Sequence, residues 1–250
     1  MDRLRLRAIP LGLVALLLLA ANSMSHAQGT CILKLDPTGL ITISRGGVDA
    51  GVIELNAHGP NWQHAPQKSA TGQISSLSAN AGKRVTGALP IPNTTAGAAI
   101  RFVETVRPLP QGANLTYDLA MGADMKLSGV QVSVLLPVAL FAGREIVVSR
   151  PDNDPEVVVM PEEQGTRNFQ LWRGDGAKIE VAKGTPEAMT IQFRAAADVV
   201  IQDLRQWEQQ VFEIRFPAVM EDPGRDVFAD DRLHLDVTVS FPDPVTLQVP

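Results

Sequence analysis

The sequence contains a single cysteine, Cys31, which excludes a disulfide bond within the chain. Cys31 opens the apolar stretch CILKL, and we expect it to be a strand residue rather than a catalytic nucleophile. A lipid-modified cysteine is the alternative, although Thr30 stands where such a signal would have Gly, Ala or Ser. The cysteine content therefore argues against thiol catalysis.

The common catalytic motifs are also missing. The sequence has no G-x-S-x-G, H-E-x-x-H, C-x-x-C or G-x-x-x-x-G-K-[ST]. After residue 27 the only histidines are His58, His64 and His234. His58 and His64 share one segment, but a zinc site needs a third ligand that the sequence does not identify. We therefore predict no metal site from the histidines.

Only one long apolar run occurs, LGLVALLLLAA at 11–21. It follows the basic MDRLRLR, precedes SHA and Gln28, and is too short to span a bilayer, which predicts a signal peptide over 1–27. An uncleaved N-terminal anchor is the alternative. We expect an exported protein, periplasmic or extracellular, without a membrane span after cleavage.

Clusters of lysine and arginine are absent as well. The formal net charge is −5, and loss of 1–27, with three arginines and Asp2, makes it about −7. An acidic chain is a poor partner for nucleic acid or for an anionic membrane surface. We therefore expect neither as a partner.

Apolar and polar residues alternate throughout the rest of the chain. This period of two is typical of antiparallel strands with one buried face, whereas buried parallel strands are continuously apolar. The clearest alternating stretches are 41–44, 114–121, 130–136, 189–194 and 233–241. With no long helical pattern, the sequence predicts an all-β, antiparallel two-sheet β-sandwich that forms one domain over 28–250. Turn residues such as RGDGA at 173–177 are expected to separate its strands.

The stretch VVIQDLRQWEQQVFEIRF at 199–216 contains the strongest candidate for chemistry. We predict strand, loop, strand, with Asp203 and Arg205 on one face of the first strand and Trp207 in the connection. Burial would raise the pKa of Asp203 unless a cation pairs with it, and Arg205 is the obvious cation. The two residues are thus either a catalytic acid or base with its partner, or a structural ion pair.

Trp62 and His64 lie in the polar stretch HGPNWQH. A loop tryptophan beside amide side chains can stack on a sugar ring, and the alternative is a ring folded over the sheet edge. Trp62, His64 and Trp207 are therefore our candidate ligand-binding residues.

Acidic loops offer oxygen ligands at 152–156 and 226–231, but neither follows the EF-hand order. We expect no cofactor, with calcium as the alternative.

Three segments carry a resemblance to a known family: GLITISRGG, LPVALFAGREIVV and VIQDLRQWEQQVFEIRF. In their order they resemble the supersandwich of galactose-mutarotase-like domains and of accessory domains in bacterial secreted glycosidases. The resemblance implies a carbohydrate partner. The surroundings of His58, His64 and His234 do not match the catalytic histidine–glutamate set of mutarotases, so epimerase activity does not follow.

These observations leave three hypotheses. The first is an exported, non-catalytic protein that binds carbohydrate or accompanies a carbohydrate-active enzyme. The second is a glycoside hydrolase or polysaccharide lyase that uses Asp203 with Arg205. The third is a structural envelope protein that binds another chain. The sequence alone does not decide whether the protein is an enzyme.

Overall fold

The computed structural model describes residues 30–78, 81–165 and 169–250. The predicted signal peptide, residues 1–27, lies outside these ranges, so its cleavage stays a prediction. Within the described ranges no helix has the length and apolar character needed to cross a membrane.

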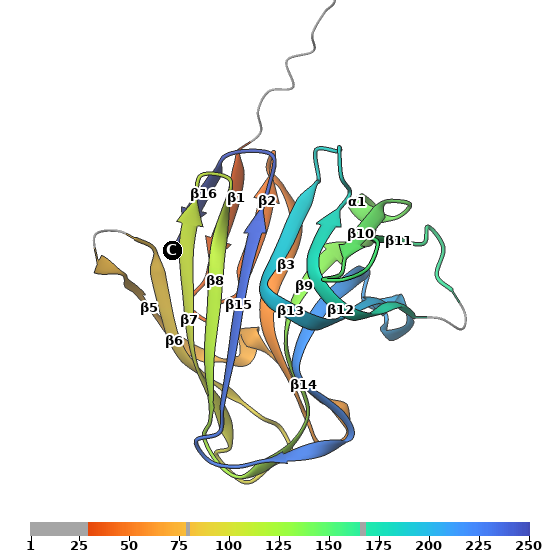
Figure 1. Cartoon of the computed structure of the whole chain (residues 1–250). Coiled ribbons are helices and arrows are strands. Elements are labelled where there is room, and N and C mark those ends of the chain that lie inside the picture. Colours follow the sequence, from red (N-terminus) through yellow and green to blue (C-terminus); the bar gives the residue numbers. More distant parts are fainter. Residues whose placement is uncertain (1–29, 79–80, 166–168) are drawn as a thin grey trace, which may run out of the picture.

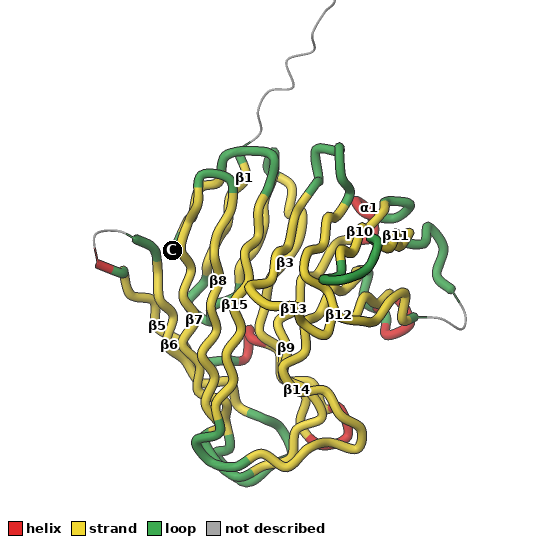
Figure 2. The backbone as a smooth tube through the Cα atoms, viewed as in Figure 1, coloured by secondary structure: helices red, strands yellow, loops and turns green. Residues whose placement is uncertain are grey.

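Strands dominate the described chain (Figure 2), and the all-β prediction is confirmed. The described strands are β1 (Cys31–Leu35), β2 (Ile41–Arg45), β3 (Val48–Gly59), β4 (Gln63–Pro66), β5 (Thr71–Ser76), β6 (Lys83–Pro90), β7 (Ala99–Leu109), β8 (Gly112–Met121), β9 (Met125–Pro137), β10 (Glu145–Ser149), β11 (Glu156–Val159), β12 (Gln170–Val181), β13 (Met189–Asp203), β14 (Val211–Val227), β15 (Arg232–Ser240) and β16 (Val245–Gln248). Short helical turns lie between them: η1 (Pro60–Trp62), η2 (Gln67–Ser69), α1 (Val138–Phe141) and η4 (Leu204–Trp207).

Hydrogen bonds join these strands into one large sheet that curls (Figure 1). Its main path runs β16-β1-β2-β3-β9-β14-β13-β15-β8-β7-β6-β5, and β4, β10, β11 and β12 attach beside it. The described strand pairs are antiparallel except for the parallel pair β1–β16. The antiparallel prediction therefore holds, while the division into two separate sheets and the single domain over 28–250 stay predictions.

Alternate residues of most strands supply the core. On β14, Phe212, Ile214 and Phe216 are at most 2% exposed. Burying a large apolar side chain stabilises the fold by about 1.5–3 kcal/mol. Cys31 on β1 is also fully buried, and this burial raises the pKa of its thiol to about 11. The thiol is thus protonated at neutral pH, as expected for a strand residue without a catalytic role.

The neighbouring strands β3, β9 and β14 position polar residues on the opposite face. Their register places Glu54 beside Ser133 and Ser133 beside Arg215. One step along, Asn56 lies beside Gln131. Because alternate residues of a strand point to one face, these side chains gather on the side away from the core.

The turn predicted at RGDGA is wrong. Residues 173–177 lie inside β12, which pairs with β13 on both sides of a register shift between Gly176 and Lys178. Glycine within a strand often marks such an irregularity rather than a chain reversal.

Candidate ligand-binding cavity

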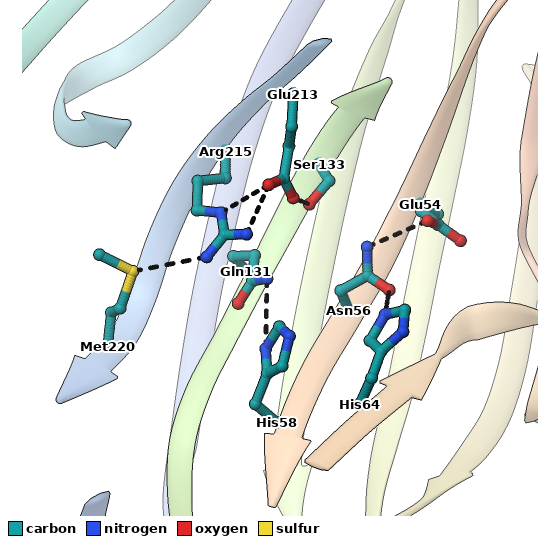
Figure 3. A network of polar contacts seen from close by, with 9 residues as sticks. All are labelled: Glu54, Asn56, His58, His64, Gln131, Ser133, Glu213, Arg215 and Met220. Atoms are coloured by element: carbon teal, nitrogen blue, oxygen red, sulfur yellow. Dashed lines mark hydrogen bonds and ion pairs between the residues drawn. The ribbon is translucent and has the colours of Figure 1, made fainter. Parts of the chain in front are cut away.

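A cavity of about 550 Å³ lies over the polar face of β3, β9 and β14. We define its floor as Glu54, Asn56, His58, Gln131, Glu213 and Arg215, and its rim as Trp62, Phe169 and Trp207. Figure 3 shows how the floor residues project from the three strands, with His64 on β4 at one side. This volume falls within the range of small-molecule sites, which is about 300–1,000 Å³.

Glu213 and Arg215 form an ion pair at one end of the floor. Arg215 donates from Nε to Oε2 of Glu213 at 2.9 Å and from Nη2 to the same oxygen. The other carboxylate oxygen, Oε1, accepts a 2.6 Å hydrogen bond from Ser133 Oγ. Among the described residues, Arg215 Nη1 contacts only Met220 Sδ, at 3.8 Å. The charge of Arg215 is therefore balanced within the protein, and Nη1 is its donor with the weakest partner.

Glu54, Asn56 and His64 form a chain of hydrogen bonds at the other end. Asn56 Nδ2 donates to Glu54 Oε1 at 3.1 Å, and Asn56 Oδ1 lies 2.9 Å from His64 Nε2. Since Oδ1 can only accept, this orientation requires the hydrogen of His64 on Nε2. Burial raises the pKa of Glu54, the Asn56 hydrogen bond lowers it, and the charge of Glu213 raises it again. The pKa of Glu54 therefore lies above its ordinary value, and its carboxyl group lines the cavity.

His58 is the floor residue that is held neutral. Its ring is stacked on that of His64 at 5.2 Å between centroids, and its Nδ1 lies 3.4 Å from Gln131 Nε2. Burial lowers the pKa of His58 to about 3, and the charges of Arg215 and His64 add to this effect. Burial also lowers the pKa of His64. Both imidazoles can therefore exchange hydrogen bonds at neutral pH without adding charge.

In the described part of the chain, no residue donates a hydrogen bond to the side-chain oxygen of Gln131. The residue is fully buried, and among the described residues its Oε1 has no hydrogen-bond partner. A buried acceptor left without a donor costs about 1–3 kcal/mol. The atom has almost no accessible surface, so this cost belongs to the folded protein rather than to a ligand contact.

The rim consists of exposed aromatic rings. Trp62 is 37% exposed and its backbone is left-handed, with φ 59°, next to Asn61 with φ 58°. A bulky residue in this region is strained by about 1–3 kcal/mol, and such strain is concentrated at functional sites. Trp207 is 49% exposed and meets Phe169 edge to face at 5.0 Å. The rim offers flat apolar surfaces beside a polar floor.

All three ligand-binding residues predicted from the sequence, Trp62, His64 and Trp207, line this one cavity. Their part in binding stays a prediction. The sequence does not predict the floor. Its residues nevertheless come from strands with visible alternation or with polar positions two apart, as at 54, 56 and 58.

Asp203 and Arg205 do not line the cavity. β13 ends at Asp203 and Arg205 lies in η4, so the prediction that one strand presents both side chains on one face is wrong. The two residues form a buried ion pair, with 2.7 Å between Arg205 Nη2 and Asp203 Oδ2. Their catalytic role stays a hypothesis, but the geometry is that of the structural alternative.

Within the described ranges no three His, Cys, Asp or Glu side chains gather as a metal site. In the predicted acidic loop at 152–156, Glu156 instead accepts hydrogen bonds from Arg150 at 2.9 Å and Trp172 at 2.8 Å. Calcium binding remains an untested hypothesis.

Acidification is expected to destabilise the protein through His58. Its pKa is about 3 when folded and about 6.5 when unfolded, so the unfolded chain gains a proton first as the pH falls below 6.5. The contribution of neutral His58 to the free energy of unfolding is complete above pH 6.5, and about 2 kcal/mol of this contribution is lost by pH 5. Urea unfolding at pH 7 and pH 5 should show a smaller loss in His58→Gln than in the exposed control His234→Gln. Equal losses in the two variants would contradict the buried, neutral state of His58.

No protein-family model matches the chain, and no curated protein does. The solved structures that resemble it at low sequence identity include the following three. A 4-alpha-glucanotransferase from Thermococcus litoralis is 11% identical over 84% of this chain, with a TM-score of 0.48; the chain spans 35% of that protein. A candidate aldose 1-epimerase from Escherichia coli K12 is 7% identical over 85% of this chain and 98% of its own, with a TM-score of 0.45. A galactose-mutarotase-related enzyme from Lactobacillus acidophilus is 8% identical over 87% of this chain and 98% of its own, with a TM-score of 0.44. The last two are named as an aldose epimerase and as a galactose-mutarotase-related enzyme, which agrees with the weak resemblance stated from the sequence.

Proposed function

We propose that the protein binds a small, uncharged carbohydrate in the cavity over β3, β9 and β14 and does not transform it. The observation that carries the proposal is the combination of aromatic rings at the rim with buried acceptors on the floor. Sugars present apolar ring faces and many hydroxyl donors, and sites of this kind pair flat apolar surfaces with a few fixed polar groups.

The charges of the floor favour an uncharged ligand. Glu54 and Glu213 are acidic, and Arg215 is the floor's single cation, already paired with Glu213. Nearby Lys68 on η2 lowers the pKa of Glu54 only as a minor effect. The carboxylate of a uronic acid would lie near like charges and would have no hydrogen to donate to Glu54. A hydroxyl group can donate to Glu54.

Replacing Trp62 by alanine is expected to weaken sugar binding about tenfold or more. The loss of an apolar surface of this size corresponds to about 1.5–3 kcal/mol. Titration calorimetry against neutral mono- and disaccharides and the matching uronic acids measures the affinity, with Phe228→Ala as a control. Phe228 is also aromatic and exposed, and it lies outside the cavity. Unchanged affinity in Trp62→Ala, or tighter binding of the uronic acids, would contradict the proposal.

An enzyme acting on the bound sugar is the second candidate. It is favoured by the shifted pKa values of Glu54 and His58 within one cavity, since such shifts gather at catalytic sites. Proton NMR of the bound sugar over time separates the candidates. Turnover that disappears in Glu54→Gln while binding persists would replace the non-catalytic proposal.

We also propose export with cleavage after Ala27, based on the N-terminal pattern. The mass of the protein recovered from the periplasm or the medium tests it. A mass in solution that indicates a stable complex would instead favour the structural, partner-binding hypothesis.

A further inference from the structure

We infer that the Asp203–Arg205 ion pair positions the Phe169–Trp207 side of the cavity rim. The inference rests on the proposed function only where it concerns ligand affinity. The pair would then be neither catalytic nor only stabilising. Both residues would affect ligand binding indirectly, by holding the aromatic side chains of Phe169 and Trp207 in place.

Asp203 connects the two rim residues through its backbone and its side chain. Its N–H donates to the carbonyl oxygen of Phe169 at 2.7 Å. Its Oδ1 accepts from the backbone N–H of Arg205 at 3.1 Å, which caps the first turn of η4. That turn contains Trp207, so one aspartate fixes the backbone at both aromatic residues.

Arg205 completes the connection by using its whole guanidinium group. Nε and Nη2 donate to Asp203, at 2.9 Å to Oδ1 and 2.7 Å to Oδ2. Nη1 and Nη2 also donate to the carbonyl oxygens of Glu162 at 2.8 Å and Pro161 at 2.9 Å. The guanidinium carbon lies 5.2 Å from the centre of the Phe212 ring. A buried fork with this many partners has one stable orientation.

The neighbours of the pair in the chain face the cavity. Gln202 and Leu204, which flank Asp203, both line it, as does Gln170 beside Phe169. The floor residues project from β3, β9 and β14 and make no hydrogen bond with Asp203 or Arg205. Loosening the pair should therefore disturb one side of the rim and leave the floor in place.

The first test needs no ligand. In a protein whose only tryptophan is Trp207, made by Trp62→Phe and Trp172→Phe, Arg205→Lys should increase acrylamide quenching of Trp207 about twofold. Lysine keeps the positive charge, so the protein should still fold. It cannot reproduce the planar fork of arginine, so the turn that contains Trp207 should loosen. Arg101→Lys, at the exposed Arg101–Asp230 pair, is the matched control and should change nothing. Unchanged quenching in Arg205→Lys would overturn the inference.

The second test is a double-mutant cycle on affinity for the neutral sugar that binds best. Arg205→Lys should weaken binding about five- to tenfold in the wild-type background and have little effect once Trp207 is alanine. Equal weakening in both backgrounds would indicate a general effect and overturn the inference. If the wild-type protein binds none of the sugars, the proposed function fails, and the quenching test still decides whether the pair positions Trp207.

Discussion

Replacing Arg205 by methionine is expected to lower the free energy of unfolding by about 3–5 kcal/mol, because removing one partner of a buried ion pair leaves the other charge without compensation. The side chains of Arg205 and Asp203 are 7% and 4% exposed, so water cannot replace the lost partner. The carbonyl oxygens of Pro161 and Glu162 lose their donors in the same step. Urea unfolding followed by circular dichroism measures the change.

The double variant Asp203→Leu with Arg205→Met should recover part of this loss, since neither charge then remains buried. Arg101→Met supplies the comparison at the exposed pair with Asp230, where the side chains are 58% and 72% exposed. Exposed pairs contribute about 0–1 kcal/mol, so this variant should remain close to wild type. A similar, small loss in Arg205→Met and Arg101→Met would show that the buried pair contributes no more than a surface contact.

The sequence predicted the all-β fold well because alternation is a local signal. Residues such as Phe212, Ile214 and Phe216 must share a face once the segment is a strand, whatever its neighbours are. The order of strands depends on contacts far apart in the chain. The adjacency of β3, β9 and β14 joins residues about 80 positions apart, as Ser133 and Glu213 show.

The floor of the cavity was missed for a related reason. Polar residues at 54, 56 and 58, or at 131 and 133, indicate a strand face without apolar partners, which usually means a face in water. That face is covered because η1, β4 and η4 bring Trp62, His64 and Trp207 over it. The sequence indicates each of these three residues separately as a candidate for ligand binding. Their common position over the buried carboxyl groups of the floor depends on the tertiary fold.

Asp203 and Arg205 show the limit of reading a pair from spacing. Two residues apart in a strand, they would share a face, but η4 begins after Asp203 and turns the chain. The carboxylate caps this turn and pairs with the guanidinium at once. Of the two alternatives left open by the sequence, the contacts fit the structural one.

Replacing Glu104 by glutamine is expected to have a more favourable effect on the free energy of unfolding at pH 7 than at pH 4.5. The difference between the two effects should be about 3 kcal/mol. Glu104 on β7 is fully buried, and two neutral side chains donate to it: Gln67 Nε2 at 2.9 Å and the Tyr117 hydroxyl at 3.2 Å. Burial raises its pKa to about 8, although the two hydrogen bonds oppose the rise. The folded protein therefore keeps this carboxyl group protonated at neutral pH.

The sign follows from the two pKa values. The unfolded carboxyl group ionises near pH 4.5 and the folded one near pH 8, so the unfolded chain releases its proton first as the pH rises. Stability contributed by protonated Glu104 is complete below pH 4.5 and declines toward pH 8, by about 1.4 kcal/mol for each pH unit between these values. Glutamine resembles the protonated acid and does not titrate, so Glu104→Gln should lack this decline.

Unfolding curves at several pH values between 4.5 and 8 measure the difference between variant and wild type. Glu145→Gln, which replaces an exposed carboxyl group on β10, is the matched control and should follow the wild-type profile. His58 acts in the opposite direction below pH 6.5, so only the difference between profiles isolates Glu104. A constant difference across the range would mean that Glu104 is ionised in the folded protein. In that case Gln67 and Tyr117 would both donate to a charged carboxylate. Gln67 also accepts a hydrogen bond from the N–H of Leu55, beside the cavity floor, and its hydrogen bond to Glu104 would then be stronger than one to a neutral group.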